Sequence, residues 1–438
     1  MANTFLSRSN SSGTSTQKGT ISVWIKGSEE PSGNNQTTLA CWGNANNHGA
    51  LIWNGGDKID AFDYQSGYAS QLQTNALLRD SSAWYHIVYA WDTTLSTAND
   101  RQKIYINGIE QTYSTRTNYS TNAATSWNAN SYSMRVGGLN SSSYFNGLMS
   151  HIHFIDGIAY APTLFGETDS TTGQWKIKTS PSVTYGNNGF FVLKDGITIT
   201  DSSPNSNNFS LSGGTLTKTE DCPSNNFATL NPLLDVNAVP TFSNGNTTIV
   251  GSSSGGARLS GSSISVGTGK WYYEIKTTVD GSQPYIGVID AQSNIRRNSS
   301  YFVAASSGSN DSGYAVNMSG DIYHENSSTY ASNIGSISTG NILGFAVDLT
   351  STQKTCTIYK NGTSMRTFNL ANPSSGNYIL GVCSISNSTS AKCEVNFGNG
   401  KFGTTSVSSV GTNASGNGIF EYAVPSGYTA LSTKGLNL

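Results

Sequence analysis

Apolar and polar side chains alternate along residues Trp84–Gln111. An apolar run ends at Asp92, a polar loop follows, and a second alternating run closes at Asn107-Gly108. A period of two residues indicates half-buried strands, and Asn-Gly favours a tight hairpin because both central residues of that turn need positive φ. This stretch is therefore predicted to form three successive antiparallel strands.

The same pattern returns at residues Gly340–Phe368, with Asp348 and Asn361-Gly362 at the equivalent places. Two copies so far apart indicate two sandwiches of related architecture. A chain of 438 residues also exceeds what one hydrophobic core usually organises. We expect an all-β protein: a first sandwich over residues 1–165, a structured polar connector with one or two strands over 166–225, and a second sandwich over 226–438.

Charged residues make up 11% of the chain and the formal net charge is −2, against about 25% charged residues in ordinary soluble domains. Such a surface suits a neutral polar ligand. It does not suit nucleic acid, because no stretch dense in Lys and Arg is present to bind phosphates. No apolar run of about 20 residues and no signal-like start appear, so we expect a soluble protein made in a cytoplasm, without membrane insertion.

Five cysteines form an odd, scattered set without a CxxC pair, which indicates neither a disulfide framework nor a zinc site. His151 and His153 are two residues apart, so on a strand they would share one face and could hold a metal. The competing interpretation is a polar face packed under the connector. Asp92 and Asp348 could bind calcium where a strand enters a loop, or could cap their own turns. We expect no other cofactor.

The aromatic residues are the richest candidates for function. Trp24, Trp84, Trp91 and Trp271 lie within strand patterns and are expected in the cores. Other aromatic residues lie among Asn, Ser and Gly, where a ring can stack on a sugar while amides bond its hydroxyls, or can simply anchor a loop. These glycan-binding candidates are Trp53, Tyr64, Tyr68, Trp127, Tyr132 and Tyr144.

Hydrolysis of a glycan needs two carboxyl groups across the scissile bond. A strand that displays both would show acidic residues two or four apart, and none is visible. Glu274 follows three aromatic residues but has no acidic partner nearby in the sequence. We therefore expect a protein that is not an enzyme, with hydrolysis of a glycan as the minor alternative.

The first module resembles a laminin-G-like domain of the concanavalin-A-like superfamily. The matching residues are Trp24, Trp84-Tyr85-His86, Tyr105–Gly108 and Phe145-x-Gly147. The resemblance implies a jelly-roll sandwich. Family members often carry an acidic residue shortly after the last glycine, where this chain has Met149 and Ser150, so the resemblance does not extend to a calcium site there.

The second module resembles a SPRY domain, which is also a bent antiparallel sandwich. The resemblance lies in Gly269–Glu274, Ile286–Val288, Gly344–Asp348 and Val395–Gly398.

The whole chain is similar to proteins encoded by tailed phages of marine bacteria, in which FIDG, FGETDSTTG and TLNP follow one another. Here these are Phe154–Gly157, Phe165–Gly173 and Thr229–Pro232. The similarity implies a virion surface protein, made in the host bacterial cytoplasm and binding other virion proteins. It would be a tail-fibre or appendage adhesin that binds a host-surface glycan, or alternatively a capsid or tail decoration protein. A homo-oligomer, with a trimer favoured, is expected.

Overall fold

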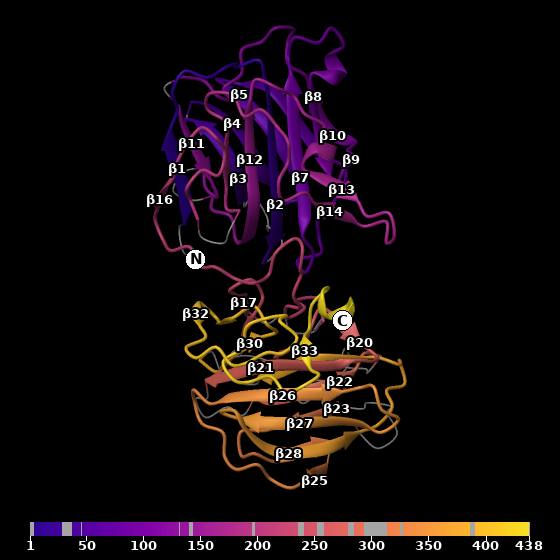
Figure 1. Ribbon diagram of the computed structural model, residues 1–438. Coiled ribbons are helices and arrows are strands. Elements are labelled where there is room, and N and C mark those ends of the chain that lie inside the picture. The colour runs from indigo at the N-terminus through magenta and orange to yellow at the C-terminus, as the bar shows by residue number, and fades with distance from the viewer. Residues whose placement is uncertain are drawn as a thin grey trace. The chain divides into compact units, whose positions relative to one another are not determined.

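The computed structural model describes residues 4–28, 37–44, 46–130, 132–139, 143–194, 198–234, 241–251, 258–278, 284–292, 313–324, 327–385 and 390–437. The chain divides into two compact units, residues 1–218 and 219–438. Both are built from antiparallel sheets, and the helices among the described residues are single 3₁₀ turns (Figure 1). The all-β fold class, consistent with two concanavalin-A-like sandwiches, is confirmed.

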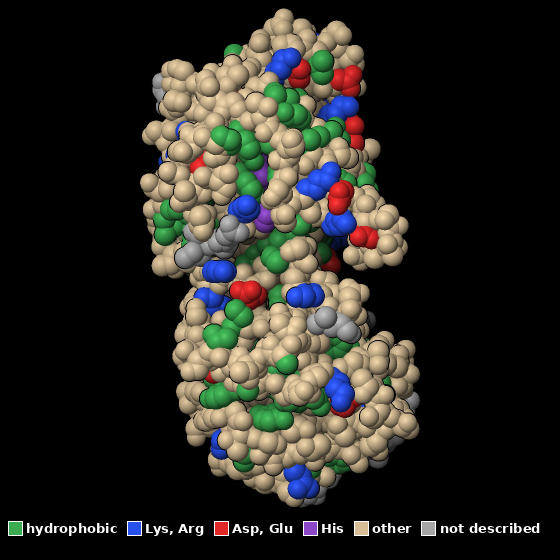
Figure 2. Space-filling model, viewed as in Figure 1, with side chains coloured by type: hydrophobic (Ala, Val, Ile, Leu, Met, Phe, Trp, Pro, Cys, Tyr) green, Lys and Arg blue, Asp and Glu red, His purple; other side chains and the backbone are tan. Residues whose placement is uncertain are grey.

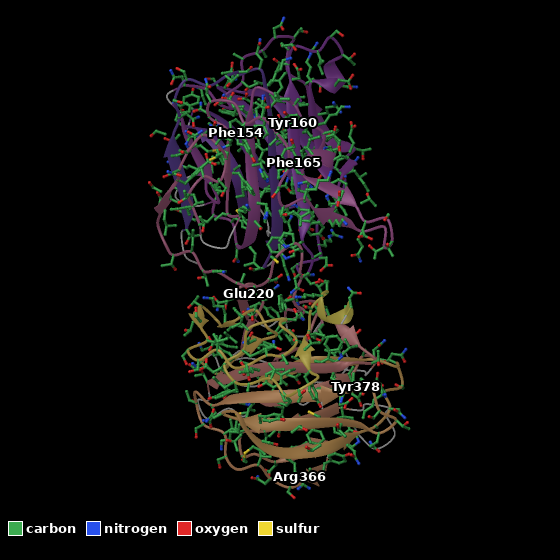
Figure 3. The ribbon with its side chains drawn as sticks, in the orientation of Figure 1. Phe154, Tyr160, Phe165, Glu220, Arg366 and Tyr378 are labelled. Carbon is green, nitrogen blue, oxygen red and sulfur yellow. The ribbon has the colours of Figure 1, made fainter. Side chains whose placement is uncertain are left out.

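Unit 1 packs two sheets face to face. The first sheet has the order β10 (Tyr113–Thr117), β6 (Tyr68–Thr74), β5 (Ile59–Gln65), β4 (Asn47–Trp53), β3 (Thr37–Gly43), β11 (Ser133–Val136), β1 (Phe5–Ser9), β16 (Ser210–Ser212). The second has the order β15 (Phe190–Val192), β12 (Gly147–Asp156), β2 (Lys18–Gly27), β7 (Tyr85–Asp92), β8 (Gln102–Ile106), β9 (Ile109–Glu110). Alternate residues of both sheets meet in one core, which includes Trp42, Trp91 and Phe154. Of these, Phe154 is labelled in Figure 3.

The segment expected as a connector belongs for the most part to unit 1. Its strand β15 pairs with β12, and β16 pairs with β1. Phe165, Tyr185 and Phe191 form a second apolar cluster with Val88 and Ile155 of the second sheet, on the side away from the main core (Phe165 is labelled in Figure 3). A hairpin of β13 (Gly166–Thr168) and β14 (Trp175–Ile177) adds to this cover. The segment covers a sheet because its large apolar side chains need a partner surface.

Unit 2 is a second sandwich. One sheet has the order β17 (Thr241–Ser243), β18 (Thr248–Val250), β30 (Lys392–Asn396), β21 (Lys270–Thr278), β26 (Ile342–Asp348), β27 (Lys354–Lys360), β28 (Thr363–Leu370), with β33 (Thr429–Ala430) beside β21. The other has the order β19 (Arg258–Ser260), β29 (Tyr378–Ile385), β22 (Tyr285–Asp290), β23 (Gly313–Val316), β24 (Ile322–His324), β25 (Ser327–Ala331), with β20 (Ser265–Val266) beside β29. A short hairpin joins β31 (Lys401–Phe402) to β32 (Thr405–Ser406).

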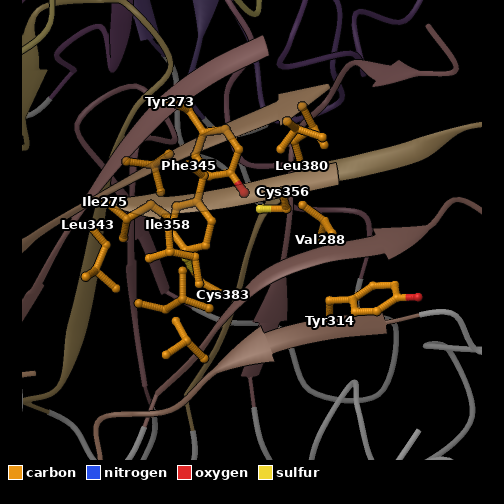
Figure 4. Close-up of a cluster of buried hydrophobic side chains, with 14 of the residues drawn as sticks. Tyr273, Ile275, Val288, Tyr314, Leu343, Phe345, Cys356, Ile358, Leu380 and Cys383 are labelled. Atoms are coloured by element: carbon orange, nitrogen blue, oxygen red, sulfur yellow. The ribbon is translucent and has the colours of Figure 1, made fainter. Parts of the chain in front are cut away.

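Figure 4 shows part of the core of unit 2, where the rings of Tyr273 and Phe345 stack with centroids 5.0 Å apart. These two residues face each other across β21 and β26, so the stack joins neighbouring strands. The residues of this core come from both sheets of unit 2, for example Phe345 from β26 and Leu380 from β29.

The two repeated stretches are matching hairpins, one in each unit. Asn107 and Gly108 have φ of 49° and 81°, and Asn361 and Gly362 have φ of 49° and 79°. In both turns the asparagine side chain accepts a hydrogen bond from a backbone N–H of the first of the three strands, from His86 on β7 at 2.8 Å and from Ile342 on β26 at 2.9 Å. The predicted three-strand arrangement is therefore present twice.

Within the described ranges, no helix has the length and apolar character that a membrane span requires.

Candidate functional site

Strand β5 places different chemistry on its two faces. Ile59 and Ala61 point into the main core of unit 1. Asp60, Phe62 and Tyr64 alternate with them and therefore point to the outer face of the first sheet. Phe62 and Tyr64 belong to a separate small apolar cluster on that outer face. The outer face of β4, β5 and β6 is the candidate site.

Four rings gather on this face, and we call them the aromatic patch: His48, Phe62, Tyr64 and Tyr68. Tyr64 and Tyr68 are cross-strand partners at the end of the β5–β6 hairpin, with centroids 5.6 Å apart and planes at 85°. Phe62 lies 5.7 Å from Tyr68 and 5.6 Å from His48. Tyr68 is 55% exposed, and its hydroxyl makes no hydrogen bond within the described part of the chain. The patch thus offers a large aromatic side chain to solvent.

Asp60 lies beside the patch, two residues before Phe62 on the same face of β5. It is 5% exposed. Its Oδ2 accepts a hydrogen bond of 3.0 Å from the Gln71 amide, whereas its buried Oδ1 has no partner. Burial raises the pKa of Asp60 to about 6, against the opposite effect of the amides of Gln71, Gln73 and Asn54. Oδ1 is therefore the carboxyl oxygen that accepts no hydrogen bond within the described part of the chain.

No cation of the described chain neutralises Asp60. The Lys58 ammonium, also near the start of β5, donates to Ser114 Oγ at 2.9 Å and lies 3.5 Å from Gln73 Oε1, but forms no salt bridge with Asp60. Burial lowers the pKa of His48, the other ionisable group of the patch, so its ring is held in the neutral form. Aromatic rings, two glutamine amides and one unpaired carboxyl group thus share a single surface.

The structure brings together only two of the six predicted glycan-binding residues. Tyr64 and Tyr68 lie side by side, although on strands rather than in loops. Tyr132 and Tyr144 lie apart from them: Tyr144 contacts Phe5, with centroids 6.1 Å apart, and Tyr132 is followed directly by β11.

The prediction that Trp53 and Trp127 bind a glycan is wrong. Their side chains are 1% and 0% exposed and belong to the main core of unit 1. The Trp127 indole donates to the Tyr119 hydroxyl at 3.1 Å, which in turn donates to Asp63 at 3.1 Å. A Cβ at Gly49 would lie only 2.6 Å from this indole, so the glycine leaves room for it. A ring without an exposed face has no surface on which a sugar could stack.

Asp92 and Asp348 do not form an open metal site. Each forms a salt bridge with a lysine, at 2.9 Å with Lys18 and 2.8 Å with Lys270. Each also accepts a hydrogen bond of 2.9 Å from the backbone N–H two residues further on. Burial alone would raise the pKa of both carboxyl groups, but these donors outweigh it and hold each pKa below the usual value. Asp92 and Asp348 therefore cap their own turns, as the second of the two interpretations holds.

His151 and His153 are separated by a bulge in β12, where His151 has φ of 48°. His153 shares a 2.9 Å hydrogen bond with the Tyr185 hydroxyl and stacks on Phe191, with centroids 3.9 Å apart. Burial lowers the pKa of His153 well below its usual value. Both residues thus lie beneath the segment once expected as a connector, and among the described residues no group of three or more His, Cys, Asp or Glu could hold a metal.

Glu274 is buried on β21 and anchors the C-terminal segment. Its carboxylate accepts backbone hydrogen bonds from Glu421 at 2.8 Å and Tyr422 at 2.9 Å, and side-chain bonds from Tyr272 at 3.2 Å and Asn396 at 3.4 Å. Burial raises its pKa to about 7. Because the side chain is fully enclosed and bonded on both oxygens, it presents no acid or base to a substrate.

Sequence reasoning missed Asp60, Phe62, His48 and Gln71. The β5 sequence IDAFDYQ carries large apolar residues at both alternating sets of positions, so the pattern does not reveal which set faces outward. The polar and aromatic mixture at Asp60, Phe62 and Tyr64 was the available signal.

Residues 3–159 match the family described as the concanavalin A-like lectin/glucanases superfamily. This confirms the concanavalin-A-like, laminin-G-like character of the first unit. No curated protein matches the chain.

Solved structures with similarity include the SPRY domain of human HERC1, at 17% identity over 34% of this chain and 87% of that one, with a TM-score of 0.26. Domains LG4-5 of the mouse laminin alpha1 chain match at 10% identity over 98% of this chain and 84% of theirs, with a TM-score of 0.31. Domain 4 of AbnA, an extracellular arabinanase from Geobacillus stearothermophilus, was solved in complex with arabinotriose. It matches at 19% identity over 34% of this chain and 65% of its own, with a TM-score of 0.26.

Proposed function

We propose that the protein binds carbohydrate, without cleaving it, on the outer face of β4, β5 and β6. The observation that carries this proposal is the position of Tyr68, which is 55% exposed beside the unpaired Asp60 carboxyl group. Binding sites for small ligands combine apolar and aromatic surface with a few placed polar groups. In this proposal the C–H face of a pyranose stacks on the Tyr68 ring, and Gln71 and Gln73, on the same face of β6, offer amide groups to its hydroxyls.

Low charge supports this proposal. Figure 2 shows few Lys, Arg, Asp and Glu side chains on the face in view, where most of the surface is backbone and uncharged polar side chains or Gly. Contacts from rings and amides do not depend on ion pairs, and salt screens only charges. The share of the affinity that rings and amides contribute should therefore change little between about 50 mM and about 500 mM salt.

The biological setting that we propose is the surface of a tailed-phage virion, where the protein acts as a tail-fibre or appendage adhesin. Support for this setting comes from the sequence similarity carried by Phe154–Gly157, Phe165–Gly173 and Thr229–Pro232. The alternative is a decoration protein whose sandwiches bind capsid or tail proteins. In either role we propose a homo-oligomer, with a trimer favoured, because a weakly charged surface offers little mutual repulsion.

A binding assay on the full chain tests the proposal. Tyr68→Ala and Tyr64→Ala should each weaken binding to host envelope polysaccharide, whereas Tyr144→Ala, a partly buried aromatic residue outside the patch, should not. Shortening of the polysaccharide during incubation would favour the hydrolase alternative. If no host glycan binds, the decoration role is favoured, and labelling of this protein on purified virions would then locate it and count its copies.

A further inference from the structure

We infer that the sugar bound at the aromatic patch carries a free amino group, whose ammonium pairs with Oδ1 of Asp60. This inference rests on the proposed carbohydrate function. The ligand would be a hexosamine residue, not a neutral hexose or a uronic acid. The juxtaposition of Asp60 with Phe62, Tyr64 and Tyr68 on one sheet face points to this class.

The first step of the argument is the missing donor at Asp60. Buried polar atoms are almost always hydrogen-bonded, and a buried acceptor without a partner loses stability. Asp60 is 95% buried, its Oδ2 accepts a hydrogen bond of 3.0 Å from Gln71, and the amides of Gln73 and Asn54 lie near enough to lower its pKa. Its Oδ1 has no partner in the described chain. A group from outside the chain that donates to Oδ1 would remove this cost.

The second step is the kind of donor that these surroundings favour. The faces of aromatic rings attract cations, and cages of aromatic residues bind ammonium groups in many proteins. Three rings of the patch, Phe62, Tyr64 and Tyr68, have centroids within 6 Å of a neighbouring ring. A hydroxyl offers one uncharged donor, whereas an ammonium offers three charged ones and forms the stronger hydrogen bond with a carboxylate.

The third step concerns competing charges, taken from each neighbouring strand. Lys58, which directly precedes β5, donates to Ser114 and Gln73. On β10, which pairs with β6, the Arg116 guanidinium is bonded to Asn118 and the Asn99 carbonyl and lies over Tyr113. On β4, burial lowers the pKa of His48 and favours its neutral form. Nothing on these strands neutralises Asp60, so an ammonium is attracted there and a uronate is repelled.

Access to Oδ1 requires movement of one side chain. Tyr68 packs edge-to-face against Phe62, which lies two residues from Asp60 on the same face of β5. No hydrogen bond of the described chain holds the Tyr68 hydroxyl, and the residue is 55% exposed. Tyr68 is the most exposed ring of the patch, so the proposed binding step includes its rotation away from Phe62.

The test compares three soluble probes on the full chain: glucosamine oligosaccharides, their N-acetylated counterparts, and oligogalacturonate. We expect the wild type to bind the amine form about tenfold more tightly than the N-acetylated form, because charge-assisted hydrogen bonds are roughly twice as strong as neutral ones. The uronate should bind most weakly. Asp60→Asn should remove the preference for the amine over the N-acetylated form. Asp100→Asn, an exposed carboxylate of the same unit, serves as the matched control.

Equal wild-type binding of the amine and N-acetylated forms would overturn the inference while leaving carbohydrate binding in place. A preference that survives in Asp60→Asn would overturn the assignment to Asp60. Loss of binding to all probes, and to host polysaccharide, would instead overturn the proposed function itself. Because the wild-type comparison needs no variant, the inference remains testable even if Asp60→Asn fails to fold.

Discussion

Lys18 and Asp92 lie directly opposite each other on β2 and β7 and form a salt bridge of 2.9 Å. Unit 2 repeats this relationship with Lys270 and Asp348 on β21 and β26, at 2.8 Å. In each unit the aspartate also accepts a hydrogen bond from the threonine two residues further on. The same three groups therefore fix the junction between strand and loop in both sandwiches.

Replacement of either aspartate should destabilise only its own unit. Asp92→Ala should lower the free energy of unfolding of unit 1 by about 1–2 kcal/mol, mostly through the lost turn hydrogen bonds, because a partly exposed ion pair contributes little. Asp348→Ala should do the same in unit 2. The pKa of each carboxyl is lowered in the folded state, so this stabilisation is present above the ordinary pKa of 3.8 and is lost as the pH falls below it. Calorimetry of both variants measures the unfolding transition of each unit. If a single variant shifted the transitions of both units, the prediction that each aspartate stabilises only its own unit would be contradicted.

Trp127 and Tyr68 should respond in opposite ways to truncation. Trp127→Ala leaves a cavity in the core of unit 1 and should cost about 3–5 kcal/mol. Tyr68→Ala removes a half-exposed ring and should change stability by about 0.5 kcal/mol or less, while it weakens glycan binding. Urea unfolding and a binding assay on the same preparations separate the two effects. A Trp127→Ala protein of parental stability would place that indole outside the core.

Trp271 is the corresponding anchor of unit 2. It is 3% exposed, belongs to the main core of that unit, and donates to the Thr268 carbonyl at 2.8 Å. Trp271→Ala should cost about 3–5 kcal/mol, and Trp271→Phe distinctly less, because the phenyl ring fills part of the cavity. Melting of both variants within a degree or two of the parent would show that this placement is wrong.

Strand patterns and Asn-Gly turns were enough to predict both hairpins, because their signals are local: alternation over a few residues and a turn that needs positive φ at Asn107 and Asn361. The covering role of residues 166–218 was not predictable in this way. The composition of this segment, rich in Ser, Thr, Asn and Gly, is typical of a linker. Its cover of the sheet depends on Phe165, Tyr185 and Phe191, which pack against a sheet face that is assembled from distant strands.

The candidate site was predictable only in part. Aromatic residues among polar neighbours pointed to Tyr64 and Tyr68, and the same rule pointed wrongly to Trp127. The local sequence SWNANS around Trp127 does not show that Gly49, 78 residues earlier, leaves space for the indole in the core. The surroundings of Asp60 likewise depend on the register of β5 with β6, which places Gln73 opposite Asp60 and lets Gln71, opposite Phe62, donate to its Oδ2.

Glu274 should make the stability of unit 2 depend on pH. Burial raises the pKa of Glu274 from 4.5 to about 7, so the folded unit holds the proton more tightly than the unfolded chain does. The free energy of unfolding should therefore be highest below pH 4.5 and fall as the pH rises to about 7, by up to about 1.4 kcal/mol per pH unit. Above that window this contribution should be constant.

Urea unfolding of wild type and Glu274→Gln between pH 4 and pH 8 measures this slope. Glu274→Gln should remove the slope and also cost about 1–3 kcal/mol at low pH, because its amide N–H₂ would face the backbone N–H of Glu421 or Tyr422. Glu421→Gln is the matched control, since that side chain is bonded to the exposed Ser408 and not to β21. A slope that persists in Glu274→Gln, or disappears in Glu421→Gln, would assign the titration to another group. Because Glu274 holds two consecutive backbone N–H groups of the C-terminal segment, loss of its bonds should first release that segment from β21, which amide exchange at Tyr422 would detect.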